Sequence, residues 1–410
     1  MYRDPITGKD FNPAIVFIGG FLPSIARLAE YNYEVVKMLA KRLAKYGIKI
    51  IVLANRPDIF ISKDVKPPTN VKVIRAWYRA TTLLLPLKLI QVRKTGDILV
   101  LSLYHGIFDK SGIVNFLATL LVLVVAKVLR YKTITILHTL PELREKSFIY
   151  FTKTFSYIYC LGARITTLLI FNLSHKVLLL VKTYRDVLCD ASPNLCSKVS
   201  HIPHGVPNYV HYDYKKLSHK DVLTIAFIGL ISPRKNFIAL IKALSKVRLL
   251  LNSKIKLILI GAPHPYLFRE ALSLIRQTVN DHIDVKYLGY LETSTLQEYV
   301  YRYVDIIVLP YDNPTGTSGI AHIVAPAATP IIMPSFIEYT ELYREGHGLK
   351  LYNAYSKDLS TELAKAILGV LTNPIEYEKL SRRALSYAKT HDVARTSLML
   401  LKEIVDLWRK

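Results

Sequence analysis

The chain has 410 residues and a formal net charge of +24, and 51% of its residues are hydrophobic. This length is too great for one hydrophobic core, so two domains of about 200 residues each are expected. Its three cysteines are too few for a disulfide framework, which fits a reducing cytoplasm.

The positive charge is concentrated in the first half of the chain. Residues 1–205 contain 29 Lys and Arg against 12 Asp and Glu, a net charge of +17, whereas residues 206–410 contain 26 against 19, a net charge of +7. Such an excess favours an anionic partner: a membrane surface, a phosphate-bearing acceptor or nucleic acid. A generally basic protein without such a partner remains the alternative.

The N-terminal region predicts one complete βαβ unit. Residues 14–18 read as a strand, Gly19-Gly20 as a turn, residues 29–45 as a helix that ends at Gly47, and residues 48–53 as a second strand. No signal peptide is expected, because the first ten residues are mixed polar and the cations Lys41, Arg42 and Lys45 follow the first apolar run instead of preceding it.

Alternation of strands and helices continues beyond this unit. It is typical of a parallel, doubly wound sheet, which binds ligands at the carboxyl ends of its strands. Residues 111–129 are long and apolar enough to span a bilayer, but they lie between two strand-like runs, so a buried crossover helix is favoured. The further strands are expected at 71–74, 98–103, 133–137 and 177–181.

A second set of α/β elements follows residues 199–208, whose prolines and glycine mark the end of the first domain. Residues 211–221 are interpreted as a linker. Cys196, His201 and His204 lie close in sequence, but without a second ligand pair they predict no zinc site. The later elements are strands at 223–229, 255–260, 284–288, 306–309 and 330–333 and helices at 358–371, 375–389 and 391–408.

The expected fold is therefore α/β with two Rossmann-like, doubly wound domains facing a central cleft. We assign residues 1–205 to an N-terminal domain and residues 206–390 to a C-terminal domain. Residues 391–410 form a C-terminal helix that packs back on the first domain.

Residues 305–334 read as strand, loop, helix and strand. Their loop, Thr315-Gly316-Thr317-Ser318-Gly319, lies where the short helix begins. Helix N-termini present backbone N–H groups and a positive dipole end, which suits a diphosphate. An ordinary Gly/Ser turn is the alternative.

Several segments, in this order, resemble the GT-B glycosyltransferases, in particular glycosyltransferase family 4. The similarity covers nearly the whole chain. Scarce glutamine and abundant Lys, Ile and Tyr are also typical of a thermophilic, archaeal source. The matching segments are AIVFIGGFLP, TITILHTLPELRE, KVSHIPHGVPN, IAFIGLISPRKNFIALIKAL, LILIGAPH and VKYLGYL.

The resemblance implies that residues 1–205 form the acceptor-side domain and residues 206–390 the nucleotide-sugar domain. It also implies roles for particular residues. In such enzymes a diphosphate leaves, and preorganised cations and N–H groups stabilise the charge that develops on it. The implied catalytic residues are His138, Arg234 and Lys235. The implied donor-binding residues are Gly19, Gly20, Gly229, Arg234, Lys235, Gly289, Tyr290, Asp312, Thr317, Ser318 and Gly319. From the residues alone, a solvated basic turn, a tight glycine turn and a core histidine are the alternatives.

The sequence departs from the family pattern at two places. Leu230 stands where the family often has arginine, so Arg234 is expected to substitute for it. Thr315 and Ile323 stand where many members carry glutamates, and Asp312 or the hydroxyls and N–H groups of the loop are expected to replace them.

The implied activity is retaining transfer of a hexose from a nucleotide-diphosphate sugar to a lipid-linked or glycan acceptor. It proceeds by front-face attack with no obligatory cofactor or metal ion. Basic, aromatic residues 75–94 and 144–166 favour a cytoplasmic protein peripheral at an anionic membrane, against packed helices with outward cations. A sugar-nucleotide epimerase or related non-transferase is the alternative within the fold. A basic nucleic-acid-binding protein is the alternative outside it, although no RNA- or DNA-binding motif is present.

Overall fold

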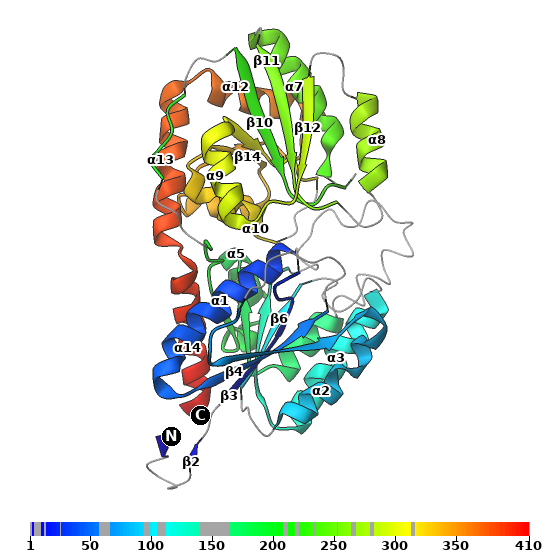
Figure 1. Ribbon diagram of the computed structural model, residues 1–410, viewed down its shortest axis with the longest axis vertical. Coiled ribbons are helices and arrows are strands. Elements are labelled where there is room, and N and C mark those ends of the chain that lie inside the picture. The colour runs from blue at the N-terminus through cyan, green and yellow to red at the C-terminus, as the bar shows by residue number, and fades with distance from the viewer. Residues whose placement is uncertain are drawn as a thin grey trace. The chain divides into compact units, whose positions relative to one another are not determined.

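Two parallel sheets organise the chain in a computed structural model (Figure 1). Contacts divide it into one unit of Met1–Gly205 with Val393–Lys410 and a second unit of Val206–Asp392. The structure describes residues 2–3, 10–11, 14–24, 26–56, 66–93, 98–104, 112–139, 165–207, 212–217, 221–232, 235–251, 253–263, 268–278, 283–312 and 316–409.

The first unit contains a seven-stranded sheet in the order β5-β4-β3-β6-β7-β8-β9. A separate antiparallel pair joins β1 (Tyr2–Arg3) to β2 (Asp10–Phe11). The strands of the sheet are β3 (Ala14–Gly19), β4 (Lys49–Asn55), β5 (Val71–Trp77), β6 (Ile98–Leu103), β7 (Lys132–Leu137), β8 (Lys176–Leu179) and β9 (Val199–His201). Its helices are α1 (Arg27–Leu43), η1 (Ala44–Tyr46), η2 (Arg79–Leu84), α2 (Leu85–Val92), α3 (Gly112–Val128), α5 (Lys182–Ala191), α6 (Pro193–Cys196) and α14 (Val393–Arg409).

Both faces of this sheet are buried at its centre, which explains why the central strands β3 and β6 are almost entirely apolar. Successive side chains of a strand point to opposite faces. Ile15 and Phe17 of β3 therefore join the core under α1 and α14, whereas Val16 and Ile18 join the core under α2 and α3.

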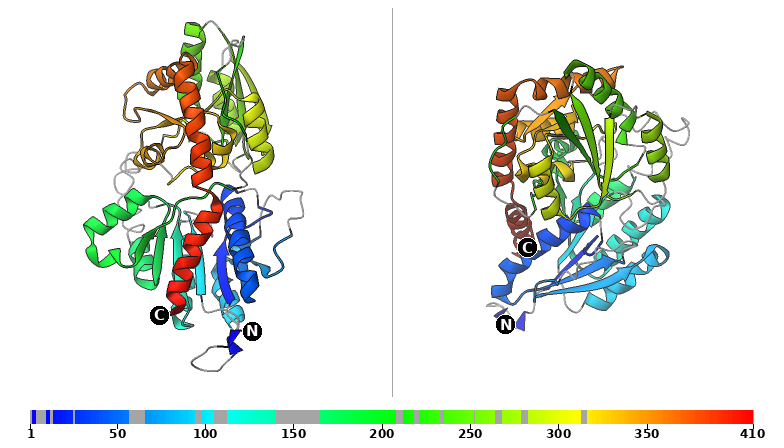
Figure 2. Two further views of the ribbon diagram at one scale, coloured as in Figure 1. Left: turned by 90° about the vertical axis from the view of Figure 1, so that its left-hand side faces the viewer. Right: turned by 45° about the horizontal axis from the view of Figure 1, so that its top comes forward.

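Helix α14 belongs to the first unit although it is last in the sequence. It packs beside α1 (Figure 2) and contributes Leu400 and Ile404 to the core that they share. Thr396 Oγ1 donates a hydrogen bond to the Pro203 carbonyl at 2.9 Å. A Cβ on Gly205 would lie 2.4 Å from Val393 Cα, so only glycine allows this approach.

The second unit contains a six-stranded parallel sheet in the order β12-β11-β10-β13-β14-β15. Its strands are β10 (Val222–Ile228), β11 (Lys254–Ile260), β12 (Ile283–Gly289), β13 (Ile306–Val308), β14 (Ile331–Pro334) and β15 (Leu349–Tyr352). Its helices are α7 (Phe237–Leu251), α8 (Phe268–Thr278), α9 (Thr293–Tyr303), α10 (Gly319–Val324), η6 (Ala325–Ala327), α11 (Ile337–Arg344), α12 (Leu359–Leu371) and α13 (Pro374–Thr390).

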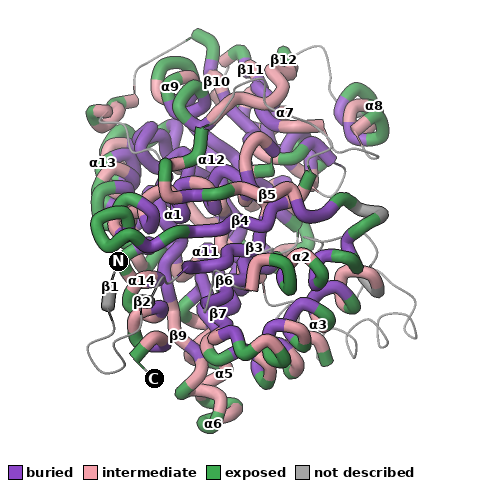
Figure 3. Tube along the Cα trace, turned by 60° about the horizontal axis from the view of Figure 1, so that its bottom comes forward, coloured by how far each residue is buried: buried purple, intermediate pink, exposed green. Residues whose placement is uncertain are grey.

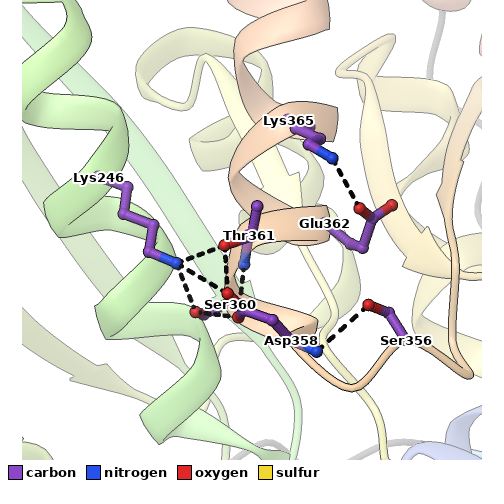
Figure 4. Close-up of polar contacts among 7 residues, drawn as sticks. All are labelled: Lys246, Ser356, Asp358, Ser360, Thr361, Glu362 and Lys365. Carbon is purple, nitrogen blue, oxygen red and sulfur yellow. Dashed lines mark hydrogen bonds and ion pairs between the residues drawn. The ribbon is translucent and has the colours of Figure 1, made fainter.

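Helices α7 and α12 of the second unit are joined by a polar cluster (Figure 4). Asp358 caps α12 by accepting from the Thr361 N–H at 3.0 Å. Hydrogen bonds from the Thr361 and Ser360 hydroxyls, the Thr361 N–H and Lys246 hold the pKa of this carboxyl well below its usual range. Lys246 Nζ lies 3.3 Å from Asp358 Oδ2 and donates to Ser360 Oγ at 3.0 Å, which ties α7 to the start of α12.

Residues 212–217 are not the linker that their composition suggests. The Lys215 N–H donates to Ser381 Oγ of α13 at 2.6 Å, and its ammonium group hydrogen-bonds the Val304 carbonyl and Thr329 Oγ1. Polar composition was misleading here because these polar groups are satisfied by the second unit rather than by water.

One disulfide was also missed. Cys189 and Cys196 are bonded, with sulfur atoms 2.11 Å apart, and join α5 to α6. Three cysteines are too few for a disulfide framework, but they are enough for a single disulfide bond. The bond removes Cys196 from any metal set with the neighbouring histidines. Cys160 lies outside the described residues.

The expected α/β alternation is confirmed, including the crossover helix near residues 111–129. It is α3, which connects β6 to β7. No helix among the described residues has both the length and the apolar character needed to cross a bilayer. Helix α3 is buried on the side that faces the sheet, as predicted, whereas Leu117 and Leu121 on its other side are exposed.

Two glycines of the second unit should respond oppositely to substitution by alanine. Gly261 has φ +152° and a Cβ there would lie 1.8 Å from the Gly229 carbonyl oxygen, whereas a Cβ on Gly369 in α12 meets nothing within 4 Å. Gly369→Ala should raise the free energy of unfolding by about 0.5–1 kcal/mol. Gly261→Ala should lower it by about 3 kcal/mol or more. Urea unfolding measures both variants. Equal effects of the two substitutions would contradict the close approach of Gly261 to Gly229.

Candidate active site

The second unit has a topological switch point at its first strand. β10 pairs with β11 on one side and with β13 on the other, so the chain leaves it in opposite directions across the sheet. Open α/β sheets bind ligands outside the carboxyl ends of the strands at this position. The loops that follow β10 and β13 contain most of the residues predicted for the donor.

Three neighbouring strands end in closely packed glycines. The Gly229 N–H donates to the Ile260 carbonyl and the Gly261 N–H to the Gly289 carbonyl, both at 2.8 Å. Gly229, Gly261 and Gly289 all have positive φ, which glycine adopts readily. The predicted Gly229 and Gly289 thus lie on one edge, with Tyr290 directly after β12, and Gly261 is an unpredicted member of the set.

Lys235 lies in the loop between β10 and α7. Its N–H donates to the Ser232 carbonyl at 3.1 Å, and its Nζ is 4.2 Å from the centre of the Tyr311 ring. Burial lowers the pKa of the ammonium group to about 8, while the nearby Asp312 carboxylate opposes this shift. A poorly hydrated cation that lies over an aromatic ring is well placed to attract an anion. Arg234 lies outside the described residues.

Tyr311 connects Lys235 to the loop after β13. The tyrosine is buried, and burial raises the pKa of its hydroxyl to about 12 although a hydrogen bond with Ser318 opposes the rise. Ser318 also accepts from the Ala321 N–H at 3.4 Å and so caps α10. The structure therefore brings together Lys235, Ser318 and the exposed Asp312, with Tyr311 between them.

The loop hydroxyls predicted to bind the donor already have partners. Thr317 Oγ1 is 2.7 Å from His322 Nε2, and His322 Nδ1 is 3.0 Å from the Tyr387 hydroxyl. Buried His322 thus fixes Thr317, as Tyr311 fixes Ser318. Gly319 is the first residue of α10, where backbone N–H groups remain as potential donors.

Of the two positions aligned with the family's glutamates, the structure describes Ile323 but not Thr315. Ile323 is 2% exposed and belongs to the hydrophobic core of the second unit. Its carbonyl accepts from Gln297 Nε2 at 2.8 Å. An ionised carboxylate would be unfavourable in that environment, so isoleucine suits this backbone. Thr315 lies outside the described residues.

The first unit has its own switch point, between β3 and β6. The Gly19-Gly20 turn follows β3 and is held by amide and guanidinium groups. Asn32 Nδ2 donates to the Gly20 carbonyl at 2.9 Å, and the Phe21 N–H donates to Asn55 Oδ1 at 3.3 Å. Arg75, whose pKa burial lowers, donates to the carbonyls of Phe21, Leu22 and Asn55.

His138 is linked to this turn by a chain of hydrogen bonds. Its Nε2 is 3.0 Å from Ser102 Oγ, and the Ser102 hydroxyl donates to Asn32 Oδ1 at 2.9 Å. Because Ser102 donates its one proton to Asn32, it must accept from His138. We therefore assign the Nε2–H tautomer to His138, which leaves the lone pair on Nδ1.

The ring of His138 is held neutral. Burial, together with His204, lowers the pKa of His138 to about 3, and burial lowers the pKa of His204 to about 4. Tyr31 lies against both rings, with centroids 5.5 Å from His138 and 4.2 Å from His204. His138 therefore accepts or donates hydrogen bonds without carrying charge at neutral pH.

Sequence reasoning missed the residues that support the predicted ones. Ser102 is the single polar residue of β6, ILVLSL, which is a signal that could have been used. Asn32 and Tyr31 lie on the buried face of α1, where no local pattern marks them. A Cβ on Gly19 would lie 2.8 Å from Asn32 Nδ2, so the conformation of the turn and the position of Asn32 depend on each other.

The second unit is similar in sequence to a known protein family. Residues 212–387 match the family model described as "Glycosyl transferases group 1". A search of curated proteins finds no sequence match to this chain. The second unit therefore contains a domain of this family, with Lys235 and Ser318 inside the matched residues.

Solved structures resemble the whole chain at low sequence identity. Anabaena HepE in complex with UDP and glucose is 15% identical with a TM-score of 0.65, covering 96% of this chain and 100% of that one. Thermosynechococcus elongatus sucrose-phosphate synthase is 13% identical with a TM-score of 0.71, covering 97% and 100%. An α,α-trehalose-phosphate synthase (UDP-forming) from Burkholderia xenovorans, in complex with glucose-6-phosphate, is 11% identical with a TM-score of 0.66, covering 96% and 99%.

These matches confirm the fold that the sequence predicts, with two parallel-sheet, Rossmann-like domains as in the GT-B glycosyltransferases. The chain therefore has the GT-B fold. Its glycosyl transferases group 1 domain supports the glycosyltransferase activity expected of it.

Proposed function

We propose that this protein is a retaining glycosyltransferase that moves a hexose from a nucleotide-diphosphate sugar to a glycan or lipid-linked acceptor. The observation that carries the proposal is the partly buried Lys235, whose ammonium group lies over Tyr311 at the switch point of the matched domain. Anabaena HepE, which shares this fold, was solved in complex with UDP and glucose, and UDP is therefore the first nucleotide to test.

Lys235 acts on the leaving group in this proposal. The bond between the anomeric carbon and the diphosphate oxygen breaks, and negative charge grows on the diphosphate. A preorganised cation in a poorly hydrated site stabilises that charge more in the transition state than in the ground state. The acceptor oxygen bonds to the anomeric carbon on the same face, and its proton passes to the departing diphosphate.

His138 serves as a neutral hydrogen-bonding group in this proposal. With Nε2–H committed to Ser102, Nδ1 accepts a hydrogen bond from a sugar or acceptor hydroxyl. A histidine whose pKa is lowered to about 3 is too weak a base to remove the acceptor's proton. Its role is therefore to orient a hydroxyl, with Ser102 and Asn32 as positioning residues.

Nucleotide affinity should depend on the charge of Lys235. Because its pKa is lowered to about 8, the free side chain loses its charge as pH rises from 7 to 9.5, and affinity for UDP should fall over that range. Lys235→Arg should remove this pH dependence, because arginine stays protonated. Lys235→Ala should raise the Kd at pH 7 by about tenfold or more. Isothermal titration calorimetry measures all three.

The matched control is Lys242→Ala, which removes the same charge from an exposed position on α7. It should leave the Kd within about twofold, since exposed charges interact weakly. If Lys242→Ala and Lys235→Ala raised the Kd for UDP equally, the effect would come from the net charge of the protein and not from a specific contact of Lys235. GDP and ADP are titrated in parallel, and absence of binding by all three nucleotides would contradict the donor proposal.

The His138 network should govern turnover without governing nucleotide binding. His138→Gln and Ser102→Ala should each lower kcat by about tenfold or more, because a misplaced hydrogen bond to a reacting group is costly, with little change in UDP affinity. The pH–rate profile between pH 5 and 8 should keep its shape in His138→Gln. Loss in that variant of a limb near pH 6.5 would show that His138 titrates during catalysis. Incubation with the sugar nucleotide but no acceptor distinguishes the two activities, because only an epimerase would convert the sugar without an acceptor.

A further inference from the structure

Helix α3 has an exposed apolar stripe along its length. Leu117, Leu121, Val124 and Val128 are 38%, 40%, 40% and 74% exposed. Their spacing of four, three and four residues places them on one side of the helix. The opposite side, with Ala118 and Val122 among others, is buried against the sheet, so the stripe is additional to the core that α3 requires.

The neighbouring segment η2–α2 has a second stripe of the same kind. Leu83, Leu84, Leu87 and Ile90 are 44%, 54%, 54% and 48% exposed, and α2 and η2 both contact α3. Leu85 and Leu89 between them are fully buried. Figure 3 shows exposed and buried turns alternating along both helices. We call the eight exposed residues of the two stripes the aliphatic face.

Cations lie on and beside the helices that carry the aliphatic face, and acidic residues are scarce in the surrounding sequence. Residues 66–139 contain 11 Lys and Arg against two acidic residues, Asp97 and Asp109, which both lie outside the described residues. Lys127 and Arg130 are exposed at the end of α3, and half-buried Lys88 lies on α2 between Leu87 and Ile90. Their long side chains can extend from the edge of an apolar surface into water.

We propose that the aliphatic face docks on an anionic lipid bilayer, with α2 and α3 lying in the interface. Aliphatic side chains enter the boundary between headgroups and acyl chains, and the surrounding cations bind anionic headgroups. A second copy of the chain fits less well, since pairing two such faces would bring like charges together. Docking does not depend on glycosyl transfer and would bring a lipid-linked acceptor and the basic unit to the same surface.

Vesicle flotation of the full chain tests the docking. Vesicles of phosphatidylcholine alone are compared with vesicles that contain about one third phosphatidylglycerol, at low salt and at about 0.5 M salt. The protein should float with the anionic vesicles at low salt and much less with the neutral ones. Leu87→Glu/Leu121→Glu should lower the bound fraction by about tenfold or more, because it adds negative charge and removes apolar contact. Lys88→Glu/Lys127→Glu should lower it about as much.

The matched control is Ile375→Glu, at a residue of α13 that is 82% exposed in the second unit. It should leave flotation unchanged. Circular dichroism and the melting temperature establish that each variant is folded, which is expected because none of the substituted positions is buried. Equal binding by Leu87→Glu/Leu121→Glu and wild type, or no preference for anionic vesicles, would overturn the proposal. A dimer in solution that Leu87→Glu/Leu121→Glu dissociates would assign the face to a second copy instead.

Discussion

Burial of both faces of two parallel sheets is the constraint on which the rest of this structure depends. It requires central strands that are largely apolar and crossover helices on both sides. Parallel strands then bring their carboxyl ends to one edge, so the polar and glycine-rich residues of distant loops gather there. Lys235 and Ser318 meet at Tyr311 for this reason, and so do His138 and the Gly19-Gly20 turn at Ser102.

The two units use burial in opposite ways. In the second unit, burial removes water from the Lys235 ammonium group and lowers its pKa to about 8. A poorly hydrated cation attracts an anion more strongly than a fully hydrated one. In the first unit, burial lowers the pKa of His138 to about 3 and keeps the ring neutral, and the Ser102–Asn32 chain then selects its tautomer. In the glycosyl transfer that we propose, the charged group would bind the diphosphate and the uncharged group would orient a hydroxyl.

The fold could be predicted from the sequence because strand and helix periodicity is local. Segments such as AIVFI and LTIAFI, the crossover helix α3 and the loop of Lys235 all follow from their own residues. The supporting contacts could not be predicted in the same way. Asn32 meets Ser102 across 70 residues of sequence, and Lys215 meets Ser381 across 166, so no local pattern contains either hydrogen bond. The Cys189–Cys196 pairing likewise depends on how α5 and α6 are arranged.

The central claim is that the switch point of the second unit binds a nucleoside diphosphate. Hydrogen–deuterium exchange with and without UDP tests it most directly, because it locates binding along the chain without requiring an acceptor. Exchange should slow in peptides that contain residues 229–240 and 311–322, since a bound ligand suppresses local opening. Saturating UDP that leaves these peptides unchanged, or protects only segments far from both loops, would contradict the account.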